Sequence, residues 1–256
     1  MTSVPVFHIA ARWLDGDTAR IRLDGPEGRH AALVRRLQPG ERVNLTDGAG
    51  RLAECVVQGS NGPVLDLDVL DLRSVPRPDP RITVVQALAK GDRGETAVET
   101  LTEIGVDVIV PWSAGRSIAQ WKGDRGAKSL AKWRATAREA AKQARRSWWP
   151  EVTEPATTAK VARLLAAAAV PVVLHEEAEL PLAGLEPPTV APEATAAAVP
   201  EIVLVVGPEG GISPEELVQF AEAGAAPYRM GPTVLRTSTA GTAAAAVLLA
   251  RAGRWT

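Results

Sequence analysis

Two segments near the C-terminal end of the sequence contain residues suited to binding a small ligand. The first, Val206-Gly-Pro-Glu-Gly-Gly211, follows a continuous apolar run. Adjacent glycines tolerate positive φ and let backbone amides approach a ligand closely. Ser213 then starts a predicted helix, whose N-terminus suits a carboxylate or a phosphate. The spacing matches neither G-x-G-x-x-G nor a P-loop, and a simple strand-to-helix turn explains the segment equally well.

The second segment, Met230-Gly-Pro-Thr-Val-Leu-Arg-Thr-Ser-Thr-Ala-Gly241, places one arginine among hydroxyl side chains. Its small residues allow close approach of the chain, and the planar guanidinium of Arg236 offers a fork of hydrogen-bond donors. The hydroxyl groups belong to Thr233, Thr237, Ser238 and Thr239. A Ser/Thr-capped helix start with a surface arginine is the equally simple alternative.

A third segment, Leu174-His175-Glu176-Glu177, brings a histidine to the end of a predicted strand. His175 is a candidate catalytic base, although a single histidine more often packs or lies on the surface. His8 and His30 lie in the N-terminal part of the chain and do not form a metal cluster with it. Because neither a Ser-His-Asp order nor a metal-ligand spacing is present, we expect no metal site.

Positive charge is concentrated in one segment, although the whole chain has a net charge of −1. Residues 116–146 contain ten basic and two acidic side chains, a net charge of +8 that leaves −9 on the remainder. Such a patch is typical of a site for a polyanion, whereas a solvated helix face is the alternative. The basic residues are Arg116, Lys122, Arg125, Lys128, Lys132, Arg134, Arg138, Lys142, Arg145 and Arg146.

Composition narrows the class of protein. Hydrophobic residues make up 46% of the 256 residues, which is typical of a globular chain. The single cysteine, Cys55, excludes an internal disulfide framework and a cysteine-rich zinc site. The longest apolar candidate, Ala240–Leu249, is too short to cross a bilayer. We therefore expect a cytoplasmic protein with no membrane partner.

The N-terminal part of the sequence predicts short β-strands. Thr18–Leu23 and Arg51–Val57 alternate apolar and polar residues, Asp47-Gly-Ala-Gly50 is a turn signal, and His30–Leu37 has helical spacing. A small β-barrel with one or two short helices fits this pattern. The proline-rich run Val75–Pro80 is a stiff linker, so we expect domains at 1–74 and 75–256.

The second domain alternates strands and helices, which indicates an α/β fold with a parallel sheet and helices on both faces. Ligands bind at the carboxyl ends of strands in such sheets. The stretch between His175 and Glu201 is expected to be a surface loop. The expected strands are 82–88, 106–111, 170–175, 202–206 and 228–230, and the expected helices are 96–104, 128–148, 214–223 and 239–252.

Several of these segments together resemble the SPOUT methyltransferase superfamily, and within it the ribosomal small-subunit methyltransferase E family (RsmE). Any one motif is weak, whereas this order and spacing are specific and extend over nearly the whole chain. The segments that carry the resemblance are His30–Gly40, Gln86–Arg93, Glu99–Val106, Glu139–Arg146, Val206–Ser213 and Gly231–Ala240.

The resemblance implies a PUA-like N-terminal barrel and a SPOUT domain with a C-terminal trefoil knot, an exception to the rule that chains do not thread loops. It implies a homodimer that methylates uridine N3 in small-subunit (16S) ribosomal RNA, giving 3-methyluridine in the decoding region. The knot would hold S-adenosylmethionine through Leu174, His175, Glu176, Val206, Gly207, Glu209, Gly210, Gly211, Met230, Gly231, Val234, Leu235, Thr237, Ser238 and Ala240.

Catalysis at uridine N3 would require positive charge near the uracil carbonyls. We expect Arg236 to supply it, with Arg145 or Arg93 as helpers, and find no convincing general base. Trp148 and Trp149 either stack on a base or, more simply, pack in a core or dimer interface. The expected RNA contacts, to free ribosomal RNA or to the 30S subunit, are Lys90, Arg93, Arg116, Arg138, Lys142, Gln143, Arg145 and Arg146.

One position departs from the family pattern. The family often has Thr-Glu-Thr-Ala where this chain has Thr237-Ser-Thr-Ala240, so a carboxylate is missing at Ser238. An RNA-binding ribosome assembly factor with weak or no activity is therefore an alternative to the enzyme. A related SPOUT enzyme acting on transfer RNA is another, although the N-terminal barrel and the Glu139–Arg146 helix argue against it.

Overall fold

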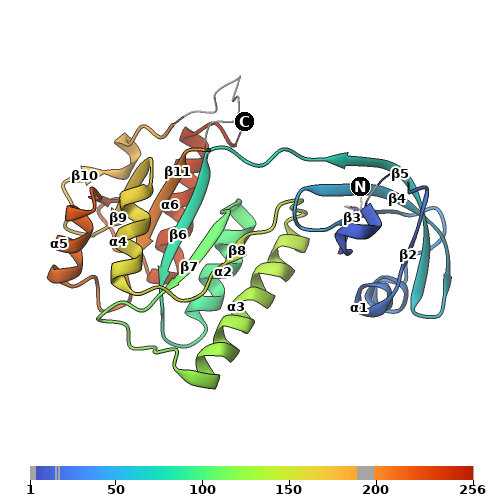
Figure 1. Cartoon of the computed structure of the whole chain (residues 1–256), viewed down its shortest axis with the longest axis horizontal. Helices are drawn as coiled ribbons and strands as arrows, with labels where there is room; N and C mark the ends of the chain where they lie inside the picture. Colours follow the sequence, from blue (N-terminus) through green and yellow to red (C-terminus); the bar gives the residue numbers. More distant parts are fainter. Residues whose placement is uncertain (1–3, 15, 17, 189–198, 256) are drawn as a thin grey trace. The chain divides into compact units, whose positions relative to one another are not determined.

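The chain forms two compact units, seen in a computed structural model that describes residues 4–14, 16, 18–188 and 199–255 (Figure 1). The first unit comprises residues up to Arg77 together with Ala141–Trp149, and the second comprises Pro78–Ala140 and the residues from Pro150 onward. The expected functional boundary between residues 74 and 75 remains a prediction. The sequence pattern does not predict that residues 141–149 belong to the first unit.

The first unit is built on a five-stranded sheet in the order β1-β3-β4-β5-β2. Alternating apolar side chains of these strands enclose one core, which contains Phe7, Leu45 and Leu65. Cys55 is buried in it, and burial raises the pKa of its thiol to about 12. The elements are β1 Val6–His8, η1 Ala11–Leu14, β2 Arg20–Leu23, α1 Gly25–Arg29, η2 His30–Val34, β3 Arg42–Thr46, β4 Arg51–Asn61 and β5 Val64–Ser74.

The prediction of a helix over His30–Leu37 is wrong at its C-terminal end. A π-turn covers His30–Val34, directly after α1. Arg36 then has φ 53°, a left-handed conformation that ends the helical segment before Leu37.

The predicted turn Asp47–Gly50 is confirmed between β3 and β4. Two tryptophan rings from a distant part of the chain pack against it. The carboxylate of Asp47 accepts the backbone N–H groups of Ala49 and Arg51 at 2.7 and 3.1 Å. A Cβ on Gly50 would lie 2.5 Å from the ring of Trp148, and one on Gly48 would lie 2.6 Å from the ring of Trp149. The tryptophans therefore pack inside the first unit, as the simpler interpretation predicts.

The second unit contains a seven-stranded sheet in the order β10-β12-β9-β11-β6-β7-β8. All of its described strand pairs are parallel, which confirms the α/β expectation. The central strand β11 is almost wholly buried, as its apolar run predicts. The strands are β6 Arg81–Ala87, β7 Val108–Trp112, β8 Glu151–Val152, β9 Val170–Leu174, β10 Leu180–Pro181, β11 Glu201–Val206 and β12 Ala226–Arg229.

Helices cover both faces of this sheet and create two cores. On one face, α2 (Arg93–Ile104), α3 (Gly123–Gln143) and α6 (Thr237–Arg251) pack against β6 and β11. On the other face, α4 (Thr158–Ala167) and α5 (Pro214–Glu222) pack around Phe220 and Val205. The sequence pattern does not predict α4. It does predict the capping box of α5, which Ser213 and Glu216 form.

Two sequence-based expectations for this region are corrected. The helix expected to reach Trp148 ends at Gln143, because Arg145 adopts φ 54° and the Arg146 amide closes back on the carbonyl of Ala141 at 2.9 Å. The stretch expected to be a loop between His175 and Glu201 contains β10 and the 3-10 turn Leu182–Gly184, while its residues 189–198 lie outside the described residues. Within the described ranges, no helix is both long and apolar enough to cross a membrane.

A buried ion pair joins the C-terminal segment to the start of the sheet. The guanidinium of Arg254 donates to the carboxylate of Asp107 at 2.6 Å, and both side chains are 10% exposed. The same guanidinium donates to the carbonyls of Pro80 and Gly105, at 3.1 and 3.0 Å. Asp107 also accepts the backbone N–H of Ile82 at 2.9 Å. The pair therefore ties the segment after α6 to the first residues of β6 and β7.

Replacing Arg254 with Ala should lower the free energy of unfolding by about 3 kcal/mol, because the Asp107 carboxylate would stay buried without its cation. Urea denaturation followed by circular dichroism measures this loss. Arg229→Ala, at an exposed arginine of β12, is the matched control and should change stability by less than about 0.5 kcal/mol. Equal stability of the two variants would contradict this role for Arg254.

Candidate active site

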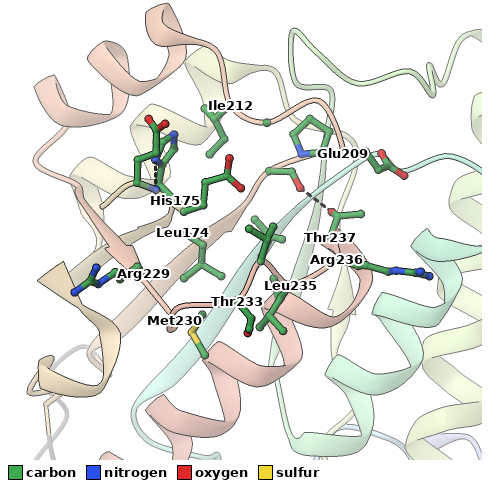
Figure 2. Close-up of a pocket in the computed structure, with 18 of the residues that line it drawn as sticks. Leu174, His175, Glu209, Ile212, Arg229, Met230, Thr233, Leu235, Arg236 and Thr237 are labelled. Carbon is green, nitrogen blue, oxygen red and sulfur yellow. Dashed lines mark hydrogen bonds between the residues drawn. The ribbon is translucent and has the colours of Figure 1, made fainter. Parts of the chain in front are cut away.

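A cavity of about 710 Å³ opens where the three ligand-binding segments meet (Figure 2). Strands β12, β9 and β11 are neighbours in the sheet, so their carboxyl ends lie side by side. The N-terminus of α6 completes the rim, and Arg93 and Arg116 reach it from other loops. The lining residues are Arg93, Arg116, Leu174–Glu177, Val206–Ile212, Tyr228–Thr237 and Ala240.

The glycine segment after β11 is shaped by close contacts that exclude side chains. A Cβ on Gly207 would lie 2.8 Å from Cγ1 of Ile212, and one on Gly210 would lie 3.1 Å from the carbonyl oxygen of Arg116. Gly211 has φ +74°, and its amide donates to the carbonyl of Pro208 at 2.9 Å. The segment is therefore a tight turn whose backbone faces the cavity.

A buried chain of hydrogen bonds joins this turn to the first residue of α6. The Gln86 amide nitrogen donates to the Thr237 hydroxyl at 3.0 Å, and that hydroxyl donates to the carbonyl of Gly207 at 2.7 Å. Gln86 is fully buried near the end of β6, and its Oε1 has no partner among the described residues. Thr237, expected at the cofactor, therefore uses its hydroxyl to hold the start of α6 to β6 and to the turn after β11. We call this arrangement the Gln86–Thr237 clasp.

Glu209 is held by a cation rather than pointing freely into the cavity. Its carboxylate accepts from the guanidinium of Arg93 at 3.0 Å and from the backbone N–H of Lys90 at 3.2 Å. Burial alone would raise the pKa of Glu209, but its own amide, that of Lys90 and the Arg93 guanidinium together lower it. Since the folded pKa is depressed, this stabilisation is present above the ordinary glutamate range and is lost as pH falls through the lowered value.

Glu216 anchors the loop that brings Arg116 to the cavity. Its buried carboxylate accepts from the backbone N–H groups of Gly115 and Ser213 at 2.8 and 3.1 Å, and from the Thr158 hydroxyl at 2.9 Å. The capping box thus also anchors the loop after β7, which brings Arg116 to the cavity. The sequence indicates the cap but not this second role, because Gly115 lies far away in the chain.

His175 contributes a wall of the cavity and has one ring nitrogen already engaged. Its backbone N–H donates to the carbonyl of Tyr228 at 2.9 Å, which continues the pairing of β9 with β12. Its Nδ1 accepts the backbone N–H of Glu177 at 3.2 Å. A neutral ring in this arrangement carries its proton on Nε2, so neither nitrogen of that form is a free base.

Arg236 stands at the N-terminal boundary of α6 and lines the cavity. Arg236 is exposed, and among the described residues its guanidinium has no hydrogen-bond or ion-pair partner. Figure 2 shows the side chain pointing away from Leu174 and Met230, toward the side of the cavity where Glu209 lies. The cation is therefore available to a group that enters from that side.

The structure brings together most residues expected at the cofactor. All of them line the cavity except Ser238, which is buried in the first turn of α6 with 7% of its surface exposed. Within the described ranges, no group of three or more His, Cys, Asp or Glu side chains could hold a metal ion.

The residues expected to contact RNA are distributed over both units. Arg93 and Arg116 line the cavity, while Lys90 and Arg138 are exposed elsewhere in the second unit. Lys142, Gln143, Arg145 and Arg146 belong to the first unit. There Lys142 forms a largely buried ion pair with Glu27 at 2.8 Å, which engages its ammonium within the protein.

Comparison with known proteins agrees with both halves of this description. An RNA methyltransferase domain family matches residues 76–249, and an RNA methyltransferase PUA domain family matches residues 23–67. A ribosomal RNA small subunit methyltransferase E of Mycobacterium bovis is 45% identical over 244 residues, which cover 93% of this chain and 90% of that protein. The Bacillus subtilis protein of the same name is 26% identical and covers 85% of each chain.

Two solved structures share the fold along nearly the whole chain. One is a ribosomal RNA small subunit methyltransferase E from Neisseria gonorrhoeae bound to S-adenosyl methionine, with 25% identity and a TM-score of 0.79. The other is a Legionella pneumophila protein in complex with the bound cofactor SAM, with 25% identity and a TM-score of 0.80. Each comparison covers 97% of this chain and 98% of the other.

The Gln86–Thr237 clasp predicts a loss of stability when its hydroxyl is removed. Thr237→Val keeps the shape of the side chain but leaves the buried Gln86 amide with fewer partners, so the free energy of unfolding should fall by about 2 kcal/mol. Thr237→Ser should retain most of the wild-type free energy of unfolding, because the serine hydroxyl can form the same hydrogen bonds. Urea denaturation measures both, with Thr233→Val on the exposed part of the same loop as control. A Thr237→Val protein as stable as the Thr233→Val protein would refute the clasp.

Proposed function

We propose that this chain transfers a methyl group from S-adenosylmethionine to uridine N3 in small-subunit ribosomal RNA. The premise is that the chain belongs to the ribosomal RNA small subunit methyltransferase E family. The product is 3-methyluridine in the decoding region. The observation that carries the proposal is the convergence of three strand ends and one helix N-terminus on a single cavity. An arginine that has no partner among the described residues lines this cavity.

The cavity has the chemistry that this methyl donor requires. Its volume of about 710 Å³ is within the range of small-molecule sites. Leu174, Ile212 and Leu235 supply apolar wall for an adenine ring, and the glycine segment 207–211 supplies backbone polar groups. Glu176 and Glu177 add negative charge to the rim, which matches a cationic ligand. When bound, S-adenosylmethionine supplies an electrophilic methyl group.

An RNA substrate is supported by the names of the relatives and by the distribution of charge. The proteins of Mycobacterium bovis and Bacillus subtilis are both named for small-subunit ribosomal RNA. Arg116 brings the positive charge of segment 116–146 to the cavity rim, and Arg93, which is paired with Glu209, also lines the cavity. Phosphate contacts by such residues position a structured RNA without reading its sequence. We assign the same role to Lys90, Arg138, Gln143, Arg145 and Arg146.

Arg236 is the residue we assign to the reaction itself. Uridine N3 carries a proton that must leave before the nitrogen can attack a methyl group, and a cation beside the uracil carbonyls lowers the pKa of that N–H. The Arg236 guanidinium is exposed and unpaired within the described residues. Arg93, in contrast, is committed to Glu209, so we regard it as a helper. The absence of the family carboxylate at Ser238 is compatible with activity, since that position lies outside the cavity lining.

We further propose a cytoplasmic homodimer with domains at 1–74 and 75–256. The support for a dimer is apolar surface beside the cavity, since Val234 is 74% and Leu235 is 38% exposed on the loop before α6. Exposed apolar side chains that form a contiguous patch commonly mark an interaction surface. The trefoil knot expected from the family also remains part of this proposal.

The wild-type protein should transfer a labelled methyl group from S-adenosylmethionine to 30S subunits that lack the modification. Nuclease digestion and mass spectrometry should locate the label in 3-methyluridine. Fully modified subunits and bulk transfer RNA serve as controls and should accept little label. Binding of 30S subunits without any transfer would instead favour the assembly factor, and preferential labelling of transfer RNA would favour the related SPOUT activity.

Arg236→Ala should reduce the rate of transfer about a hundredfold, the usual loss when one group that stabilises transition-state charge is removed. The residual rate should rise more steeply with pH than that of the wild type, because the N3 proton must then leave unaided. Arg163→Ala on α4, an exposed site away from the cavity, is the control. Both variants should sediment as the wild-type dimer. Activity of Arg236→Ala within a few fold of the control would exclude the assignment.

A further inference from the structure

A second cavity, of about 300 Å³, lies beside the first turns of α2 and α3. The loop after β6 and the loop after β7 form its walls together with the two helices. Its lining includes Gly91, Gly94, Ile118, Trp121, Arg125 and Trp133. Neither the proposed cofactor site nor the proposed catalytic arginine uses these residues.

Two tryptophans give the second cavity an aromatic wall held in a fixed position. The rings of Trp121 and Trp133 meet edge to face, with centroids 4.9 Å apart. Trp133 is buried against α2, where a Cβ on Gly94 would lie 2.7 Å from its ring. Trp121 is half-buried, so part of its ring borders the cavity. A rigid, partly exposed indole is a platform on which a planar ring can stack.

The remaining wall combines an exposed apolar side chain with polar groups. Ile118 is 67% exposed although it lines the cavity. The amide of Gln120 and the hydroxyl of Ser129 also line it, and neither side chain has a hydrogen-bond partner among the described residues. An apolar ring with polar atoms at its edge, such as a nucleobase, would satisfy both kinds of wall.

The charge around the second cavity is positive. Arg125 lines it and is exposed, and the exposed Lys122 and Lys128 lie three residues before and after it, with Asp124 as the acidic residue between them. The one carboxylate in the described lining, that of Glu95, is neutralised by Lys132 at 3.0 Å. The surroundings therefore favour an anionic ligand, and a nucleobase brings a phosphate with it.

The second cavity adjoins the active-site cavity through shared loops. Arg93 lines the active site, whereas its neighbour in sequence, Gly94, lines the second cavity. In the same way Arg116 lines the first, and Ile118 lines the second. Positions one or two residues apart lie within about 7 Å of each other along the chain, so one short RNA strand can reach both cavities.

From this arrangement we infer that the second cavity binds an unpaired nucleobase of the substrate RNA next to the target uridine. The base stacks on Trp121, contacts Ile118 and hydrogen-bonds Gln120 or Ser129, while Arg125 contacts its phosphate. Sequence-specific recognition of RNA commonly uses unstacked bases held in this way. The inference rests on the proposed function, and it adds a subsite that reads a neighbouring nucleotide.

The test measures binding of unmodified 30S subunits by filter retention, without S-adenosylmethionine. Trp121→Leu should weaken binding about tenfold, the loss of one stacked base, and Trp121→Phe should remain within threefold of the wild type. Ile118→Ser should weaken binding severalfold, with Val218→Ser on α5, which is 59% exposed, as matched control. Arg125→Gln should lower the slope of binding against salt by about one, unlike Arg163→Gln.

Three results would overturn the inference. The first is 30S binding by Trp121→Leu and Ile118→Ser equal to that of their controls. The second is an equal loss of S-adenosylmethionine affinity in calorimetry, which would make the second cavity part of the cofactor site. The third is a change of sedimentation, which would make it an interface between copies. If Trp121→Leu fails to fold, the exposed Ile118 and Arg125 variants decide. If the variants weaken 30S binding as expected but the wild-type protein transfers no methyl group, the proposed function is refuted and the base subsite stands.

Discussion

The geometry of the active-site cavity depends on one buried hydroxyl group. Thr237 accepts from Gln86 and donates to Gly207, so a single side chain connects β6, the turn after β11 and the start of α6. A fully buried amide such as that of Gln86 is costly unless it is hydrogen-bonded, so the loops cannot separate without leaving polar groups unpaired. The clasp thereby fixes where the loop before α6 ends, directly after Arg236.

Acidic side chains around the cavity organise loops more than they perform chemistry. Glu216 fixes the loop that carries Arg116, and Glu209 holds Arg93 beside the glycine turn. Because Glu209 and Glu216 are engaged within the protein, Glu176 and Glu177 are the carboxylates of the described lining that remain open to a ligand. This division of labour explains how a site can work by positioning and charge without an evident general base. Ser238 itself is buried in the first turn of α6 and lies outside the cavity lining.

Two cavities that share their loops make recognition of the target and of its neighbour interdependent. The loop after β6 supplies Arg93 to one cavity and Gly91 to the other, and the loop after β7 supplies Arg116 and Ile118. A strand of RNA that fills the second cavity would order the same loops that border the first. Binding energy from a non-reacting nucleotide can then be used to position the reacting one.

Many local elements could be predicted from the sequence, although α4, β8 and β10 could not. The apolar run of β11, the capping box of α5 and the turn at Asp47–Gly50 depend on neighbouring residues, and each has a pattern that can be recognised. The motifs and their spacing placed the three ligand-binding segments at strand ends. Tertiary structure alone decided which distant partners these residues meet. Lys142, predicted to contact RNA, pairs with Glu27, and Gln86 in its apolar strand supports Thr237. These pairs lie more than a hundred residues apart, and the order in which helices and strands pack in the folded chain brings them together. Local periodicity in the sequence does not encode that packing order. The cavity could therefore be predicted from the sequence, whereas the contacts that stabilise it could not.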